Sequence, residues 1–317
     1  MLQTWSMVGW LLGWFTERQF RRLSLVHQRD DAARSATREI FDGFVRGANL
    51  AFRRAPLARL REVSATEIPW HRRPFFWEGV AFGRAGRHSV RPGRWRPEPA
   101  GDGAYRAMHY TGYGMWSGVA GGLALPSVPV TADHWRAVSD HSRLSPLIAG
   151  GTAFALVAHT GRFDSARLHN AVPRGQPDIW RTATWHGSGR ALWFLYMNNV
   201  EPLVALLDAH PQIRTELLEG LGMAITFTNI ASPEAGRGWI RQFPGTDQPA
   251  LWRGCGICLN ALVEDDPDNA ARVAAIDIEE FRAARDAGAR ASSVVPRGPE
   301  WYQNALAYLR QALPDAR

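Results

Sequence analysis

The sequence VEPLVALLDAHPQIRTELLEGLGMAITF, at residues 200–227, contains two apolar stripes of helical spacing with a break between them. The first stripe consists of Val200, Leu203, Val204, Leu206 and Leu207. His210 and Pro211 interrupt the pattern, and the second stripe consists of Ile213, Leu217, Leu218, Leu221, Ala224 and Ile225. Because apolar residues at steps of three and four share one face of a helix, this stretch predicts two helices that pack as an αα-hairpin.

Glycine-led segments of small and aromatic residues recur on both sides of this hairpin. They are EGVAFG at Gly79, GYGMWSG at Gly112, GGTAFA at Gly150, GSGRALWF at Gly187, GLGMAITF at Gly220 and GCGICLNA at Gly254. Successive glycines are 33, 38, 37, 33 and 34 residues apart, which is the length of a helix-turn-helix unit. Small residues let helix backbones approach closely, so the spacing predicts a closed or curved α/α repeat stack of helical hairpins. Because the chain contains 30 glycines, chance is the alternative explanation.

The rest of the chain also favours helices over strands. Apolar spacing predicts further helices at 32–62, 249–263, 269–287 and 300–313. A stretch rich in Arg, Pro and Gly predicts a loop at 84–103. Alternation typical of strands is scarce, so the expected fold class is mainly α. We expect an N-terminal helical segment at 1–47, docked on a helical core domain at 48–317.

The composition is that of a folded protein with an unusual choice of basic residue. Of 317 residues, 45% are hydrophobic and 21% are charged, a balance typical of globular chains. All 37 basic residues are arginines, so Schiff-base enzymes and nucleotide sites that use a lysine are excluded. Arginine without lysine is also what a GC-rich coding bias produces. The net charge of +7 is therefore weak support for a nucleic-acid partner, and we expect none.

Two features bear on the compartment. Cys255 and Cys258 cannot form a disulfide framework, so we expect a cytoplasmic protein. The apolar stretch WSMVGWLLGWF, at residues 5–15, is shorter than the roughly 20 residues that cross a bilayer, and it lacks the features of a secretory signal. Three arginines follow closely behind it. The stretch predicts either a helix docked on the core or an aromatic anchor for peripheral contact with a membrane.

Three segments carry a resemblance to a known family. They are FFWEGVAFG at 75–83, HGSGRALWF at 186–194 and NNVEPLVALLDAHPQIRTELLEGLGMAITF at 198–227. These segments are similar to a bacterial family known as domain of unknown function 1702, which is found in natural-product gene clusters, including those of enediyne polyketides. The resemblance extends from about Ala48 to Val263 and implies a role in bacterial specialised metabolism. The chain departs from the family at 148–155, where IAGGTAFA stands in place of an acidic, glycine-rich run with a histidine.

Two ionisable residues lie in otherwise apolar helical segments. Glu78 has apolar neighbours on every side of its helix, and Arg190 is in the same position. Burying a charge is costly unless the charge is paired or functional. The two residues are therefore either buried counter-ions, or an acid of raised pKa and an arginine that holds an anionic ligand group. Glu219, in contrast, falls outside the apolar stripe of its helix, which predicts a surface position.

Aromatic residues near two histidines predict a ligand cavity. His109 and His186 each lie beside aromatic residues and glycine, as proton-transfer groups of a cavity would, although core histidines occur in the same setting. We predict that Glu78, His109 and His186 are catalytic. The residues predicted to bind the substrate are Trp77, Tyr113, Trp116, Arg190, Trp193, Phe194 and Asn260.

Metal binding is only weakly indicated. The ten histidines show no HExxH motif and the single CxxC pair has no second pair, so we expect neither a zinc site nor another cofactor. The run Glu264, Asp265, Asp266 and Asp268 resembles an aspartate-rich magnesium cluster, with Asp265 and Asp266 as the candidate ligands. Pro267 favours a different interpretation, in which Asp266 caps a helix that begins at the proline. Magnesium is the one cofactor left open.

The abundance of aromatic residues bears on function. The chain has 14 tryptophans and 14 phenylalanines, which predict a helical shell with aromatic walls. Such walls suit a hydrophobic small molecule and stabilise a carbocation by cation–π attraction. We expect an enzyme that cyclises or isomerises an isoprenoid or polyene by acid–base chemistry, as terpene cyclases do. The alternative is a non-catalytic carrier or accessory protein of a polyketide or terpenoid pathway. Ionisable groups that converge on the cavity favour the enzyme, and a uniformly apolar cavity favours the carrier.

Overall fold

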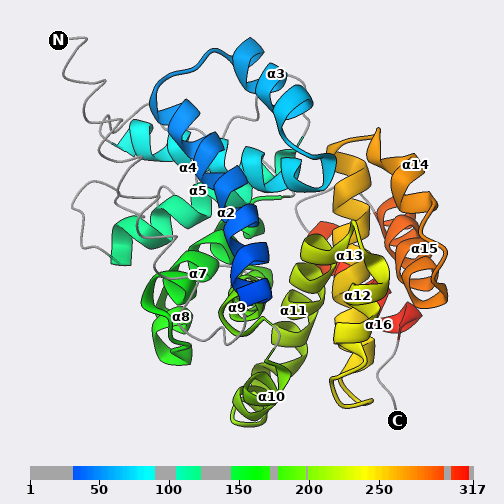
Figure 1. Ribbon diagram of the computed structural model, residues 1–317. Coiled ribbons are helices and arrows are strands. Elements are labelled where there is room, and N and C mark those ends of the chain that lie inside the picture. Colours follow the sequence, from blue (N-terminus) through cyan, green and yellow to red (C-terminus); the bar gives the residue numbers. More distant parts are fainter. Residues whose placement is uncertain are drawn as a thin grey trace.

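The structure of the chain is a computed structural model that describes residues 31–89, 105–122, 144–171, 178–197, 199–295 and 301–313. These residues form α-helices and two short 3₁₀ helices, Trp70–Arg72 and Pro211–Ile213, and they contain no strand (Figure 1). The mainly α fold class is therefore confirmed. The first helices are α2 (Asp31–Phe52), α3 (Leu57–Glu67), α4 (Arg73–Ser89), α5 (Arg106–Gly122), α7 (Pro146–Thr160), α8 (Ser165–Ala171) and α9 (Asp178–Tyr196). The remaining helices are α10 (Val200–Asp208), α11 (Arg214–Asn229), α12 (Pro233–Ile240), α13 (Gln248–Asp265), α14 (Asn269–Ala274), α15 (Glu279–Val294) and α16 (Trp301–Ala312).

The long helices pack against one another in chain order. Helix α4 packs on α2, and each of α5, α7, α9, α11, α13 and α15 packs on the preceding helix of this series. Figure 1 shows the progression from the blue helix α2 through the green helices α7 and α9 to the yellow and orange helices α13 and α15. Helix α13 also contacts α5, and α16 packs on both α13 and α15. Helices far apart in the sequence therefore share one interior.

The glycines of the recurring segments lie where these helices cross. A Cβ atom added to Gly187 would lie 2.6 Å from the Cα of Gly150, and one added to Gly220 would lie 2.8 Å from the Cα of His186. Backbone atoms of the preceding helix crowd three further glycines in the same way, namely Gly79, Gly112 and Gly254. A residue with a side chain could not occupy these positions, which gives the spacing of the glycines a physical reason. The interpretation as a closed or curved repeat stays a prediction.

The two helices predicted at 200–227 are confirmed as α10 and α11, with the 3₁₀ helix Pro211–Ile213 between them, while their packing as a hairpin stays a prediction. The predicted helix at 32–62 is instead two helices, α2 and α3. The chain turns at Arg54, whose φ is 62°, and Pro56 immediately precedes α3. Proline has no backbone N–H, and its ring disfavours helical geometry in the residue before it. This explains why the helix cannot continue through Pro56.

Two more boundaries differ from the predicted ones. The predicted helix at 269–287 is divided into α14 and α15 by residues 275–278, where Ile276 and Ile278 are buried in the core. The predicted loop at 84–103 is wrong for residues 84–89, which belong to α4, and the rest of it lies outside the described residues. Packing of the buried residues overrides local sequence preference at both places.

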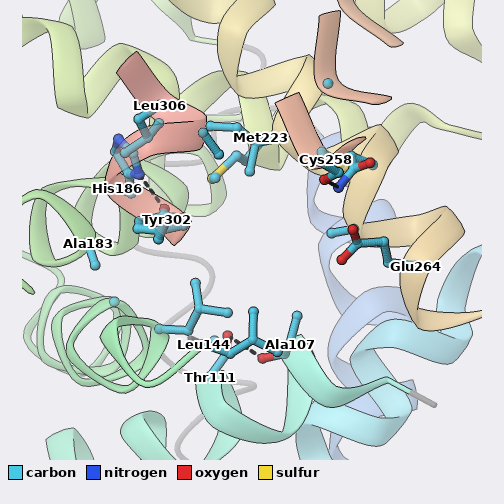
Figure 2. Close-up of a pocket in the computed structure, with 18 of the residues that line it drawn as sticks. Ala107, Thr111, Leu144, Ala183, His186, Met223, Cys258, Glu264, Tyr302 and Leu306 are labelled. Carbon is cyan, nitrogen blue, oxygen red and sulfur yellow. Dashed lines mark hydrogen bonds between the residues drawn. The ribbon is translucent and has the colours of Figure 1, made fainter. Parts of the chain in front are cut away.

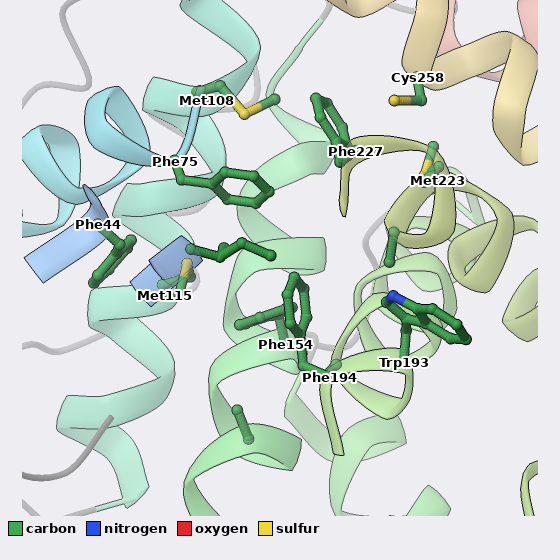
Figure 3. Packing of buried hydrophobic residues seen from close by; sticks show 14 of the residues in the cluster. Phe44, Phe75, Met108, Met115, Phe154, Trp193, Phe194, Met223, Phe227 and Cys258 are labelled. Carbon is green, nitrogen blue, oxygen red and sulfur yellow. The ribbon is translucent and has the colours of Figure 1, made fainter. Parts of the chain in front are cut away.

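Aromatic and methionine side chains from many helices meet in the centre of the structure. Figure 3 shows Phe44 of α2, Phe75 of α4, Met108 of α5, Phe154 of α7 and Phe194 of α9 converging there, and all five are buried. The ring centre of Phe194 lies 5.7 Å from that of Phe154 and 6.4 Å from that of Phe75. These edge-on contacts join the helices before and after α7 in one core.

The predictions for the N-terminal segment stay predictions. The apolar stretch at 5–15 lies outside the described residues. Among the residues that are described, no helix has both the length and the apolar character to cross a membrane. The predicted boundary between 1–47 and 48–317 falls inside α2.

Candidate functional site

A cavity of about 80 Å³ lies among α5, α7, α9, α11, α13, α15 and α16. We call it the inner cavity. Most of its wall is apolar, and Leu144, Met223 and Leu306 are examples (Figure 2). The polar side chains that line it are Thr111, His186, Arg190, Cys258, Asn260, Glu264, Ser292 and Tyr302. Because roughly 10–15 Å³ holds one water molecule, the inner cavity accepts a larger group.

A second cavity, of about 20 Å³, adjoins the inner cavity. We call it the phenylalanine chamber, because its wall contains Phe41, Phe44, Phe75, Phe154, Phe194 and Phe227. Glu78 and Arg190 are the two ionisable residues of this wall. Met108, Arg190 and Phe227 line both cavities, so the two spaces lie side by side and share these three side chains. Glu78 and Arg190 thus lie in a hollow walled by phenyl rings.

Glu78 is a buried acid in this chamber. Only 7% of the residue is exposed. Burial raises the pKa of the Glu78 carboxyl to about 7, and the charge of Arg190 acts in the opposite direction. A carboxyl with this pKa can both donate and accept a proton near neutral pH.

Arg190 is a half-buried cation between the two cavities. Its guanidinium carbon lies 5.8 Å from the centre of the Phe154 ring. The charge influences Glu78 across the chamber, but no salt bridge or hydrogen bond joins Arg190 to any residue that the structure describes. The interpretation of Glu78 and Arg190 as a simple counter-ion pair therefore has little support in the geometry.

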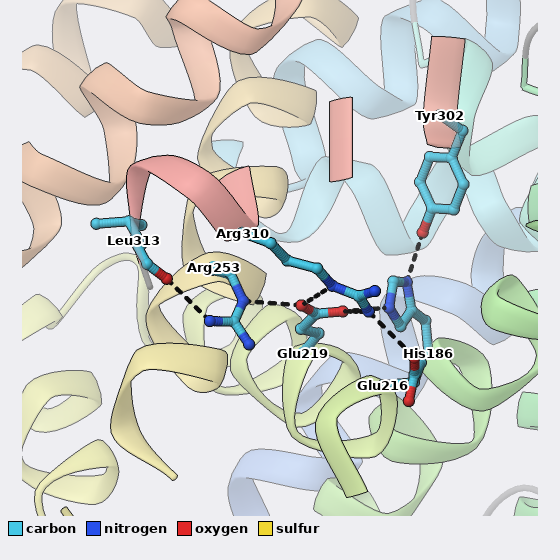
Figure 4. Close-up of polar contacts among 7 residues, drawn as sticks. All are labelled: His186, Glu216, Glu219, Arg253, Tyr302, Arg310 and Leu313. Atoms are coloured by element: carbon cyan, nitrogen blue, oxygen red, sulfur yellow. Dashed lines mark hydrogen bonds and ion pairs between the residues drawn. The ribbon is translucent and has the colours of Figure 1, made fainter. Parts of the chain in front are cut away.

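His186 belongs to a buried polar network in which Glu219 makes the most contacts (Figure 4). Its Nδ1 atom is 2.7 Å from the hydroxyl oxygen of Tyr302, and its Nε2 atom is 3.0 Å from Glu219 Oε2. An ionised carboxylate only accepts hydrogen bonds, so Nε2 carries the hydrogen that is donated to Glu219. In the neutral ring, Nδ1 then accepts the hydrogen bond of the Tyr302 hydroxyl. The order Tyr302, His186, Glu219 matches the roles of a catalytic triad, in which a carboxylate orients a histidine.

The predicted surface position of Glu219 is wrong, because the residue is 0% exposed. Glu219 accepts hydrogen bonds from Arg253 Nε at 2.9 Å and from Arg310 Nε at 3.0 Å. Burial alone would raise the pKa of Glu219, but the hydrogen bonds and charges of His186 and Arg310 lower it to about 2. The prediction failed because α11 has neighbours on two sides, with Gly220 against α9 and Gly222 against α13.

Tyr302 was not predicted as a site residue. Its hydroxyl faces the inner cavity region beside His186, and burial raises the pKa of the phenol well above its ordinary value. The helix 300–313 was predicted, and its buried face of Tyr302, Ala305, Leu306 and Leu309 has helical spacing. That spacing indicates that Tyr302 faces the core, although it does not identify His186 as its partner.

The other predicted site residues divide between the cavities and the solid core. Phe194 lines the phenylalanine chamber. Asn260 lines the inner cavity, where its Nδ2 atom donates a hydrogen bond of 2.7 Å to Ser292. The residues that lie in the core without lining either cavity are Trp77, His109, Tyr113, Trp116 and Trp193.

Two of these core residues have defined partners that explain their burial. Trp77 Nε1 donates a hydrogen bond of 3.0 Å to Ser64, and Trp193 Nε1 donates one of 3.0 Å to Thr228. His109 packs against Trp77, with the ring centres 5.8 Å apart. The indole groups thus serve the core rather than the cavity walls.

The acidic run after α13 supports the capping interpretation. Asp266 accepts a hydrogen bond of 2.6 Å from the Tyr105 hydroxyl. Its Oδ1 atom also accepts a hydrogen bond of 3.2 Å from the backbone N–H of Asp268, as expected of a capping residue before Pro267, and the regular helix α14 begins at Asn269. The side chain of Asp265 is outside the described residues. Within the described part of the chain, no group of three or more His, Cys, Asp or Glu residues is placed to hold a metal ion.

A wider hollow of about 380 Å³ lies on the outer side of α2 and α3. Its wall includes Arg46 and Arg59, and both arginines form salt bridges with Glu67. Two of its arginines are thus already paired within the chain, and the hollow is open to solvent, so we place the candidate site at the two interior cavities.

The pH dependence of stability tests the burial of Glu78. The pKa is about 7 in the folded protein and 4.5 ordinarily, so the stabilisation from the protonated carboxyl is full below about pH 4.5 and is lost as the pH rises through 7. The shift corresponds to about 3 kcal/mol. Between about pH 4.5 and pH 8, urea unfolding should show that the wild type loses about this much more stability than Glu78→Gln. Equal losses in the two proteins would contradict the raised pKa.

Comparison with known proteins identifies the family and gives no activity. No curated protein matches the chain, and no solved structure matches it. A family model described as "Protein of unknown function (DUF1702)" matches residues 15–295. The matched range includes Glu78, His186, Arg190 and Glu219 and ends before α16. The chain belongs to this family, DUF1702, whose function is unknown.

Proposed function

We propose that the protein is an enzyme that cyclises or isomerises a hydrophobic isoprenoid or polyene by moving a proton. One observation supports the proposal above the others. Two acid–base groups, Glu78 and the pair of His186 and Tyr302, line adjoining cavities with mostly apolar walls. Ring closure or double-bond migration adds a proton at one carbon and removes a proton at another, without a change of redox state. Separate groups at two positions along one apolar space suit these two transfers.

Glu78 is the proposed proton donor. In its protonated form, the carboxyl gives its proton to a carbon of a C=C bond, so a C–H bond forms and the π electrons leave a carbocation on the neighbouring carbon. The faces of the phenylalanine rings stabilise such a cation and offer no atom that would react with it. Burial keeps a large share of Glu78 protonated at neutral pH, which the reaction requires.

Tyr302 and His186 are the proposed proton acceptor. The Tyr302 oxygen takes a proton from the carbon next to the cation, and the electrons of that C–H bond form the new C=C bond. At the same time, the phenol proton passes to His186 Nδ1, which is 2.7 Å away. The ionised Glu219 stabilises the imidazolium that results. Return of a proton from His186 to Glu78 through solvent restores the resting state.

The remaining residues of the site bind the ligand in this proposal. Arg190 holds an anionic end of the molecule, and Phe194 and Asn260 contact its body. The resemblance to proteins of natural-product gene clusters supports a role in bacterial specialised metabolism.

A non-catalytic carrier of a hydrophobic intermediate is the second candidate. The largely apolar wall of the inner cavity favours it. A carrier would release its ligand unchanged, whereas the proposed enzyme converts the ligand to an isomer of the same mass.

Incubation with isoprenoids and polyenes in D₂O separates the two candidates. The enzyme should yield an isomer with one deuterium bound to carbon, detected by mass spectrometry and NMR. Turnover should fall above about pH 7, where Glu78 loses its proton. Glu78→Gln and Tyr302→Phe should each lower turnover by about 100-fold or more, because general acid–base groups contribute at least that much.

Glu201→Gln is the matched control, because Glu201 is exposed on α10. This variant should turn over at the wild-type rate. Full turnover by Glu78→Gln would contradict the role of Glu78. Recovery of every bound ligand unchanged and free of deuterium would favour the carrier.

A further inference from the structure

The unmatched charge of Arg190 indicates what kind of ligand the two cavities take. Among the described lining residues, Arg190 is the one arginine of both cavities. The structure gives its guanidinium no salt bridge or hydrogen bond within the described residues. A half-buried charge without a counter-ion is costly, so the site favours a ligand that supplies negative charge.

The acidic groups on the inner-cavity side of Arg190 do not supply that charge. Burial raises the pKa of Tyr302 and that of Cys258, so both groups are neutral near pH 7. Glu219 is ionised, but it already accepts hydrogen bonds from Arg253 and Arg310. Glu264 also lines the cavity, but it is exposed to solvent, which screens its charge.

On the chamber side, Glu78 is the single acid. The side chains that α2, α5, α7 and α11 contribute to the chamber wall are all apolar. The net charge of Arg190 and Glu78 together therefore depends on whether the Glu78 carboxyl carries its proton. While Glu78 is protonated, the positive charge of Arg190 has no match in the chamber.

We infer that the ligand is an apolar chain with a single carboxylate, and that this carboxylate pairs with Arg190. The inference rests on the proposed function, since it names the substrate class of the same site. A planar guanidinium forms two parallel hydrogen bonds with one carboxylate, so a single arginine suffices for this group. A diphosphate carries more negative charge than one arginine balances, and the chain has no lysine to add. The ligand carboxylate also supplies a counter-charge for the carbocation that forms beside Arg190.

The same geometry predicts a pH-dependent affinity. When Glu78 ionises, its carboxylate competes for Arg190 and repels the carboxylate of the ligand. Affinity for an apolar acid should therefore fall as the pH rises through about 7, and affinity for an uncharged analogue should stay constant. Glu78→Gln should remove the pH dependence and leave the acid tightly bound.

Fluorescence titration with cis-parinaric acid, a conjugated polyene acid, and with its methyl ester tests the inference. The wild type should bind the acid more tightly than the ester at about pH 6. Arg190→Gln should weaken binding of the acid by about 10-fold or more and leave binding of the ester within about twofold. Arg181→Gln is the matched control, because Arg181 is an exposed arginine of the same helix, paired with Asp178.

Three outcomes would overturn the inference alone. They are equal binding of acid and ester by the wild type, equal weakening of both by Arg190→Gln, and displacement of the acid by geranylgeranyl diphosphate with Mg²⁺ at lower concentration than by unlabelled fatty acid. Failure of the wild type to bind either probe would overturn the apolar ligand of the proposed function as well. Tight, Arg190-dependent binding of the acid with no turnover of any ligand would support the inference and contradict the enzyme.

Discussion

Gly187→Ala is expected to destabilise the protein by about 3 kcal/mol. The new Cβ would lie 2.5 Å from the carbonyl carbon of Gly150 and 2.6 Å from its Cα. Both are backbone atoms, so no side chain can rotate to make room, and α7 and α9 must move apart. That movement opens the contact along the whole crossing. It also displaces His186, which directly precedes Gly187, from its partners Tyr302 and Glu219.

Gly238→Ala is the matched control for this substitution. A Cβ atom at Gly238, in α12, would have no neighbour within 4 Å. Alanine has a higher helix propensity than glycine, so this variant should be more stable than the wild type by up to about 1 kcal/mol. Chemical denaturation of the three proteins measures both effects. Equal stability of the two variants would show that α7 and α9 do not approach as closely as the structure has them.

Glu219→Gln is expected to lower the free energy of unfolding by about 3–5 kcal/mol. Glu219 and Arg253 are both 0% exposed, and Arg253 Nε donates to Glu219 Oε1. Glutamine has nearly the same shape but no charge, so the substitution removes the negative charge that faces the buried cation of Arg253. Removing one partner of a buried ion pair costs far more than the intact pair contributes, because the remaining charge cannot regain its hydration.

Glu216→Gln tests whether the effect belongs to the buried carboxylate. Glu216 contacts the same Arg310, but its side chain is 21% exposed and that of Arg310 is 38% exposed. Its loss should cost no more than about 1 kcal/mol. The wild type should also lose stability in acid. Because the pKa of Glu219 is lowered, the stabilisation from its ionised carboxylate is present above about pH 4.5 and is lost as the pH falls through 2. Similar stability of the two variants would contradict a buried, ionised Glu219.

The sequence predicted the fold class and much of the helix content, because both depend on local patterns. Apolar spacing located the two helices at 200–227 and the helix at 300–313. The recurring glycines marked the crossings of successive helices, since only glycine leaves space for a neighbouring backbone. Apolar spacing did not locate the turn at Arg54, where Pro56 ends the helical geometry, or the connection at 275–278, which depends on burial of Ile276 and Ile278 in the core.

Burial of candidate site residues could be predicted where a single helix carries the signal. Glu78 and Arg190 stood out because their own segments offered no polar face. Glu219 could not be placed in this way, because α11 is covered on two sides and its partners come from other helices. Tyr302 is 116 residues from His186, so no spacing along the chain connects the two. Networks of this kind depend on which helices pack together. The recurring glycines indicated the crossings of successive helices, but not the contacts between distant ones.

The contribution of α16 to the inner cavity bears on synthesis at the ribosome. Helices α2 to α15 emerge before α16, and packing in chain order lets each helix meet a partner that has already been made. The wall that holds Tyr302, Leu306 and Leu309 is the last to appear, and Arg310 arrives with it. A nascent chain therefore has an unfinished wall, and Glu219 has Arg253 but not yet Arg310 as a partner, until residue 310 has left the exit tunnel. Capture of the ligand has to wait for that moment, and proteolytic loss of this one helix would undo it.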